Sequence, residues 1–270
     1  MRLTDLGNIF LHPAIFVLGT VIGSFLNVCV LRLPQEKDIV KERSRCLGCG
    51  NALLWYELIP LLGFCLVRGH CRHCRMRLSW QYPCIEALNG VLYVWFFVLY
   101  GGSYTALIYG LVASVLIIIA LVDWRTYEIP IGCNIAIGVL ALLYLVTMIL
   151  LPLRDTPFEA ATMISQLTTH IAGFFAVSGL FWLIYVLSRG RAIGGGDVKL
   201  MAVAGLLLGW QLILLALMVA AVTGSVVHLL LMRLKGKDRV LAFGPYLAFG
   251  ILVAMLGGEV ILSWYIGGWG

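Results

Sequence analysis

The stretch LIYGLVASVLIIIALV at residues 107–122 is followed directly by Asp123. The apolar span to which it belongs, 104–122, has about the 20 residues that a helix needs to cross a bilayer. A second acid, Asp197, follows Gly194-Gly195-Gly196 and directly precedes another apolar run. Because an ionisable group at membrane depth is costly, we interpret both acids first as functional.

Working outward from this stretch, the same apolar character extends over most of the chain. The 270 residues are 61% hydrophobic and only 12% charged, which is typical of a polytopic membrane protein and excludes an ordinary soluble domain. Apolar spans separated by Gly, Pro or charged residues recur at 13–33, 84–101, 104–122, 131–151, 167–188, 198–210, 211–232 and 243–265. We therefore predict an all-α polytopic membrane protein with about eight transmembrane helices.

The spacing of these spans predicts three parts. Residues 1–33 form a first transmembrane helix, which we expect to be retained because no small-residue cleavage site follows its long apolar stretch. Residues 34–83 form the one extended hydrophilic segment, a small loop domain. Residues 84–270 form a seven-helix membrane core that carries both acids.

The distribution of basic residues predicts the orientation in the membrane. With the N-terminus outside, all Lys and Arg except Arg2 and Arg154 fall on the inner side. The inner segments are then 32–83, 123–130, 189–199 and 233–242. Asp123, Asp197 and the loop domain share the cytoplasmic side, and topology explains the net charge of +6 without a nucleic-acid partner.

The loop domain contains two C-x-x-C pairs, Cys46 with Cys49 and Cys71 with Cys74. Two such pairs complete the tetrahedral sulfur shell of a structural Zn²⁺, a closed shell without a position for metal catalysis. Reduced thiols without metal and dithiol redox chemistry are the alternatives. Anionic membrane lipids are the expected partners of the arginines around the pairs.

The two acids also suit a joint chemical role. Asp123 is expected at the C-terminal end of one helix, where the helix dipole opposes ionisation, and Asp197 at the N-terminal end of another, where the dipole favours it. Two carboxyls that share one proton supply an acid and a base for water attack on a peptide bond. Each motif alone is weak, since a lone Asp is usually a helix cap or a solvated charge.

Several motifs together resemble one family, the bacterial type IV prepilin peptidases, whose Gly-x-Gly-Asp element is similar to that of other intramembrane aspartyl proteases. The matching motifs are Gly23 to Val28 with Arg32-Leu33-Pro34, Arg45 with the four cysteines, Ile59 to Leu62, Arg68 to His70, Tyr82-Pro83 with Glu86, Asp123 with Ile129-Pro130, Gly194 to Lys199, and Phe243 to Tyr246. Ile131 is a departure, since relatives often have Asp or Asn there.

The resemblance implies removal of the leader peptide from type IV pilin or type II secretion pseudopilin precursors at the cytoplasmic face of the inner membrane. It also implies N-methylation of the new N-terminus with S-adenosylmethionine. Asp123 and Asp197 would be catalytic, and Cys46, Cys49, Cys71 and Cys74 the metal ligands. No nucleotide fingerprint predicts where the methyl donor binds. The precursor and the oligomeric state stay open.

Two alternatives belong to other functional classes. In an ion-coupled transporter, the Gly-rich break and the buried acids would relay ions, but internal repeats, which would favour this reading, are not apparent. In a membrane zinc or redox module, the cysteines would be the active groups and the acids incidental.

Overall fold

The computed structural model describes residues 3–150, 160–235 and 242–267. Within these ranges the secondary structure is helical, apart from two isolated β-bridges. Arg2 and Arg154, which the charge pattern places outside the membrane, and residues 236–241 of the last inner segment lie outside the described residues. The chain divides into two compact units, Met1–Ile118 and Ile119–Gly270. The boundary falls within α4 (Tyr104–Thr126).

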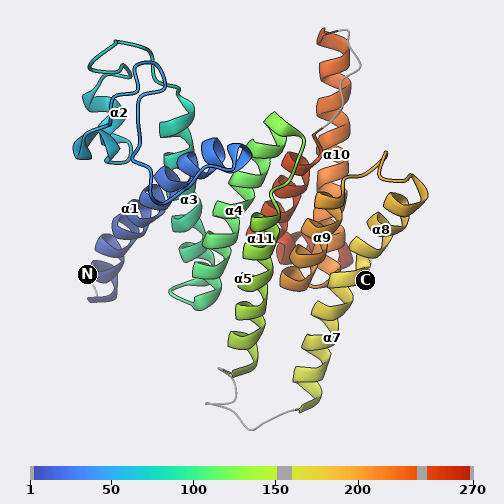
Figure 1. Ribbon diagram of the computed structural model, residues 1–270. Coiled ribbons are helices and arrows are strands. Elements are labelled where there is room, and N and C mark those ends of the chain that lie inside the picture. The colour runs from blue at the N-terminus through green and yellow to red at the C-terminus, as the bar shows by residue number, and fades with distance from the viewer. Residues whose placement is uncertain (1–2, 151–159, 236–241, 268–270) are drawn as a thin grey trace. The chain divides into compact units, whose positions relative to one another are not determined.

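The first unit is built on two long helices joined by the hydrophilic segment (Figure 1). Its elements before α4 are α1 (Leu3–Arg32), η1 (Leu33–Gln35), η2 (Trp55–Leu58), α2 (Leu62–Leu66) and α3 (Gln81–Tyr100). The hydrophilic segment therefore contains only short helical turns, and a buried apolar core is not what holds it together.

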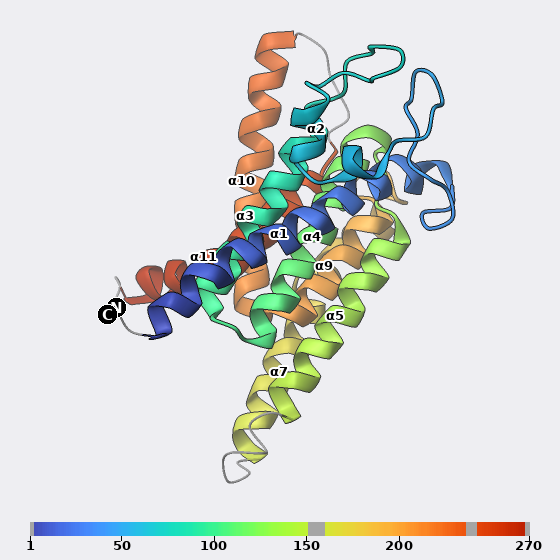
Figure 2. The ribbon, with the colours of Figure 1, turned by 90° about the vertical axis from the view of Figure 1, so that its left-hand side faces the viewer.

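α1 and α3 pack side by side at very close range (Figure 2). A side chain at Gly23 would place its Cβ 2.8 Å from the Glu86 Cα, so only glycine permits this approach. Deeper in the pair, the fully buried Asn89 amide donates a hydrogen bond of 2.7 Å to the Gly19 carbonyl. Its oxygen accepts a bond of 2.9 Å from the Ser114 hydroxyl on α4. Small residues and buried polar side chains thus hold these helices together.

The second unit continues α4 and surrounds one short helix with longer ones. Its elements are α5 (Ile131–Leu150), α7 (Ala160–Ala176), α8 (Ser178–Leu187), α9 (Gly195–Leu208), α10 (Trp210–Lys235) and α11 (Gly244–Gly267). α9 contacts α5, α7, α8, α10 and α11 (Figure 1). Its side chains from Leu200 to Leu208 are mostly buried, so α9 forms the core of this unit.

Seven helices of the described residues are long and apolar enough to cross a membrane. The prediction of an all-helical polytopic protein is confirmed. The predicted span 167–188 is divided into α7 and α8 at Val177. The predicted span 198–210 is α9, which has 14 residues and is about 21 Å long, less than the roughly 30 Å of bilayer hydrocarbon. α9 is therefore too short to span the bilayer hydrocarbon that its longer neighbours can cross.

Candidate active site and metal centre

Asp123 lies in the last turn of α4, where the sequence predicts a helix end. Its side chain is only 4% exposed, and its Oδ2 accepts a hydrogen bond of 2.9 Å from the Gly244 N–H, which opens α11. A Cβ at position 244 would lie 2.7 Å from that oxygen. A side chain at position 244 would therefore push the Asp123 carboxylate away from its present position on the Gly244 N–H.

Asp197 lies in the first turn of α9, as the sequence predicts. Burial first, and the negative charge of Asp123 second, raise the pKa of the Asp197 carboxyl to about 6, against a backbone hydrogen bond from Gly194. The helix N-terminus alone predicts a readily ionised carboxylate, but burial beside a second acid outweighs it. The two acids interact electrostatically although 74 positions separate them in the sequence.

The backbone around the two acids brings their motifs into direct contact. A Cβ at Gly196 would lie 2.9 Å from the Ile129 Cβ, so the glycine run packs against the residue before Pro130. Gly194 lies beside the acid itself, since a Cβ there would be 3.2 Å from the Asp197 Oδ2. The Gly-rich sequence thus serves close packing at both ends of the motif. Ile131, the departure noted in the sequence, is exposed at the start of α5.

Two buried polar residues near these motifs were not predicted as site residues. Asn134 on α5 is 4% exposed, and its amide donates a hydrogen bond of 3.4 Å to the Gly196 carbonyl. The Asn134 Oδ1 and the Tyr246 hydroxyl are buried without a hydrogen-bond partner among the described residues. A polar residue one turn after Pro130, in an otherwise apolar helix, was the available sequence signal for Asn134.

The four cysteines predicted as metal ligands converge in the first unit. Their Sγ atoms all lie within 4.8 Å of one another, with Cys46 and Cys74 at 3.8 Å and Cys49 and Cys71 at 3.9 Å. A tetrahedral shell with metal–sulfur bonds of about 2.3 Å has edges of about 3.8 Å. The cluster therefore fits a tetrahedral metal ion such as Zn²⁺.

The two cysteine turns are built alike. In the first, the Cys46 N–H donates to the Asn51 carbonyl and the Cys46 carbonyl accepts from the Gly50 N–H; in the second, Cys71 makes the equivalent bonds with Met76 and Arg75. All four bonds are 2.9 Å long. Backbone N–H groups of Cys49 and Gly48 lower the pKa of the Cys46 thiol to about 7, which favours the thiolate that a metal binds.

Comparison with known proteins finds a family match in each half of the chain. The family model of the bacterial peptidase A24 N-terminal domain matches residues 17–100. The family model of the type IV leader peptidase family matches residues 110–229. A prepilin leader peptidase/N-methyltransferase of Burkholderia pseudomallei is 34% identical, and the alignment covers 87% of this chain and 81% of the relative. The chain belongs to the type IV leader peptidase family.

Other relatives carry the same name. One from Dickeya chrysanthemi is 32% identical over 91% of this chain and 93% of its own length. One from Myxococcus xanthus is 33% identical over 83% of this chain, but the match spans only 64% of that relative. A search of solved structures found no significant match.

The two family matches contain the residues that the sequence predicts as site residues. The leader peptidase match contains Asp123, Asn134 and Asp197, and the N-terminal match contains the four cysteines. The chain is thus a multi-pass inner-membrane enzyme of the leader peptidase/N-methyltransferase class. This finding disfavours the alternatives of an ion-coupled transporter and of a membrane zinc or redox module.

Proposed function

We propose that this leader peptidase family member removes the leader peptide of type IV pilin or type II secretion pseudopilin precursors, with Asp123 and Asp197 as its catalytic pair. The observation that carries the proposal is the electrostatic interaction of the buried Asp123 with the half-buried Asp197, both from the family's matched region. The relatives' shared name, prepilin leader peptidase/N-methyltransferase, supports the substrate class.

The pair works by sharing a proton. Two neighbouring carboxyls do not both ionise readily, and a pKa of about 6 for Asp197 keeps a singly protonated pair accessible below neutral pH. The ionised carboxylate takes a proton from water as the water oxygen attacks the scissile carbonyl carbon. The neutral carboxyl donates its proton to the carbonyl oxygen, and no covalent acyl-enzyme forms.

Backbone groups orient the pair for this reaction. The Gly244 N–H fixes one oxygen of Asp123, and Asn134 holds the Gly196 carbonyl in the turn that precedes Asp197. Gly194 and Gly195 carry no side chains, so an extended substrate backbone can approach the second acid closely. These contacts make the two carboxyls a preorganised site.

The location of the reaction follows from charge. The excess of Lys and Arg supports an orientation with the N-terminus outside and with both aspartates and the loop domain at the cytoplasmic face. Anionic lipids of the inner leaflet attract the basic loop. The basic leader of a precursor stays at that face while its apolar helix enters among the spans.

The second activity adds a methyl group to the new N-terminal amine. S-Adenosylmethionine supplies an electrophilic methyl carbon on a positively charged sulfur. The amine attacks this carbon, the carbon–sulfur bond breaks with its electron pair left on sulfur, and the amine releases one proton to water. A structural Zn²⁺ held by Cys46, Cys49, Cys71 and Cys74 would stabilise the loop domain and take no part in this step.

The test is incubation of the purified protein in detergent with a precursor pilin and S-adenosylmethionine, followed by intact-mass measurement. The expected result is loss of the leader from the precursor and gain of one methyl group on the mature chain. An unaltered precursor, under conditions in which the Burkholderia pseudomallei relative processes it, would contradict the proposal.

A further inference from the structure

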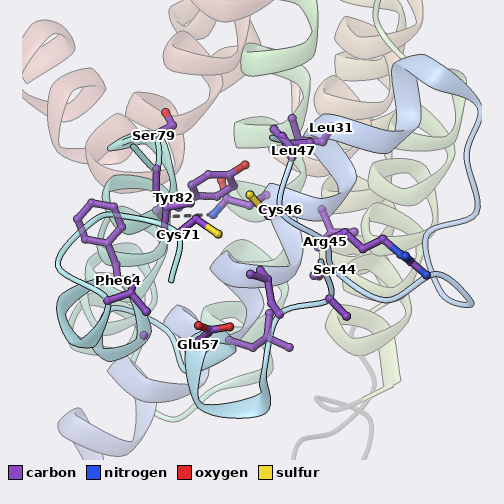
Figure 3. Close-up of a pocket in the computed structure, with 18 of the residues that line it drawn as sticks. Leu31, Ser44, Arg45, Cys46, Leu47, Glu57, Phe64, Cys71, Ser79 and Tyr82 are labelled. Carbon is purple, nitrogen blue, oxygen red and sulfur yellow. Dashed lines mark hydrogen bonds between the residues drawn. The ribbon is translucent and has the colours of Figure 1, made fainter. Parts of the chain in front are cut away.

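One face of α2 in the loop domain is apolar and exposed. Leu62 and Leu66, which lie one helical turn apart, are 61% and 65% exposed, and Cys65 between them is exposed as well. The opposite face of α2, with Gly63 and Phe64, lines an internal cavity of the first unit, and Figure 3 shows Phe64 there. The exposed face of α2, formed by Leu62, Cys65 and Leu66, is thus left largely uncovered by the described residues.

The level of α2 relative to the bilayer follows from α3. α3 has 20 residues and is about 30 Å long, which equals the thickness of the bilayer hydrocarbon, so its two ends lie at the two membrane interfaces. Trp80, which is 72% exposed, directly precedes α3, and Tyr100 ends it; both positions are typical of interfacial aromatic residues. The rings of Phe64 and Trp80 are in contact, with centroids 5.0 Å apart. α2 therefore lies at the same interface as the start of α3.

The charges around the exposed face of α2 complement an anionic surface. Residues 58–80 contain four arginines and no acid, whereas the four acids of the loop domain all lie within residues 36–57. Exposed apolar side chains bordered by arginines are typical of a segment that lies in the surface of an anionic bilayer. All four of these arginines are exposed: Arg68, Arg72, Arg75 and Arg77.

A precursor pilin is the main alternative occupant of this face, since its apolar helix could cover the same leucines. Its basic leader, however, would be repelled by the four arginines of residues 58–80. A bilayer surface with anionic lipids complements both the apolar side chains and the arginines. It also explains why this face lies at the level of an interface.

We propose that the exposed face of α2, together with Trp80, inserts into the surface of an anionic bilayer, with the arginines of residues 58–80 at the lipid phosphates. Attraction of the arginines alone would leave the loop domain above the headgroups, whereas insertion fixes its depth. Because Cys71 follows α2 in the same segment, insertion also holds the second cysteine turn near the membrane surface. The inference does not depend on the proposed peptidase or methyltransferase activity.

The experiment measures the depth of a nitroxide label on Cys65 of the full-length protein, in lipid nanodiscs that contain phosphatidylglycerol. Cys84→Ser removes another exposed cysteine, zinc is present during labelling to protect the cluster, and intact mass confirms a single label. Collision rates of the nitroxide with oxygen and with a water-soluble nickel complex give its depth. We expect the label about 5–10 Å within the boundary of headgroups and acyl chains.

A label at Val40 is the matched control. Val40 is 86% exposed and lies beside Asp38 and Glu42, in the acidic part of the loop domain. Val40→Cys, combined with Cys65→Ser and Cys84→Ser, should therefore place its label in water. A Cys65 label as accessible to the nickel complex as this control would overturn the proposal.

A substitution on the same face separates cover by lipid from cover by protein. Leu62→Asp puts a carboxylate on the face and should move the Cys65 label into water, whereas Leu62→Met keeps the face apolar and should leave the depth unchanged. Zinc content and thermal midpoint check that both variants fold. A label that keeps its depth in folded Leu62→Asp would be covered by protein, and the proposal would fail. If Leu62→Asp does not fold, the depth of the label without this substitution decides the question.

Two further conditions identify the occupant of the face. In nanodiscs of phosphatidylcholine alone, the Cys65 label should lie less deep, because the arginines lose their anionic partners. Equal depth in both lipids would overturn the assignment to an anionic surface. Addition of a precursor pilin should leave the label unchanged. A label that leaves water only when the precursor is added would assign the face to the precursor and overturn the proposal.

Discussion

At the scale of single residues, the two acids depend on neighbouring glycines, which have no Cβ. Gly244 binds Asp123 through its N–H, and Gly196 lets the second acidic motif lie against Ile129. The proposed peptidase site is therefore shaped as much by the absence of Cβ atoms as by the carboxyls themselves. This dependence makes small substitutions informative.

Gly244→Ala should lower the rate of leader removal at least about a hundredfold, because its methyl group would displace the Asp123 carboxylate and misplacing a reacting group by about 1 Å costs that much. The measurement is the initial rate of precursor cleavage. Gly257→Ala is the matched control, because Gly257 lies on the same helix and a Cβ there would meet no atom within 4 Å. Equal rates for the two variants would contradict the role given to Gly244.

Asp197 makes the folded protein sensitive to pH. Because its pKa is about 6 in the folded protein and about 3.9 in an unfolded chain, the folded state binds the proton more tightly. The free energy of unfolding therefore decreases as pH rises from about 4 to about 6. Asp197→Asn should remove this loss and stabilise the protein at pH 8 by at most about 3 kcal/mol, with no gain at pH 4.

Thermal unfolding of wild type and Asp197→Asn at the two pH values measures this effect. The exposed acid Glu128 supplies the control, and Glu128→Gln should give the same difference from wild type at both values. A gain for Asp197→Asn that is as large at pH 4 as at pH 8 would show that ionisation is not its cause.

At the scale of elements, two features stand out: α9 is too short to cross the membrane alone, and the loop domain has no apolar core. α9 places Asp197 at its first turn while the longer helices around it bury its remaining length. The loop domain is held by hydrogen-bonded cysteine turns, by the Arg32 guanidinium on the Asp38 and Ile39 carbonyls, and by the proposed metal.

Removal of the metal should therefore unfold the loop domain. Cys46→Ser, or treatment of wild type with a strong zinc chelator, should reduce bound zinc from one equivalent to near zero and speed proteolysis within residues 34–83 at least about tenfold. Cys65→Ser, which changes an exposed cysteine outside the cluster, is the control and should keep both values. A loop that stays protected without zinc would contradict the structural role of the metal.

At the scale of the whole molecule, the sequence predicts what depends on composition and local spacing. Apolar length predicts the helices, C-x-x-C spacing predicts the cysteine cluster, and acids beside apolar spans identify Asp123 and Asp197. The hydrogen bond from Gly244 to Asp123 joins residues 121 positions apart, and no local pattern encodes it. The raised pKa of Asp197 likewise depends on burial beside a distant acid, which outweighs the effect of its own helix.

The chain as a whole holds the two proposed catalytic acids and the cysteine cluster in separate units. The proposed peptidase acids belong to Ile119–Gly270, and the cysteine cluster belongs to Met1–Ile118. The two family matches divide the chain close to this boundary, since one ends at residue 100 and the other begins at residue 110. The central claim is that Asp123 and Asp197 act together on the precursor.

Single-turnover cleavage of a precursor pilin by Asp123→Asn and by Asp197→Asn tests this claim most directly, with Glu128→Gln as control. Removal of an acid or base from such a pair costs on the order of 10²–10⁴ in rate. We predict a loss of at least about 10³-fold in each aspartate variant, with zinc content unchanged and the control at the wild-type rate. Cleavage at more than about a tenth of the wild-type rate by either folded aspartate variant would contradict the account.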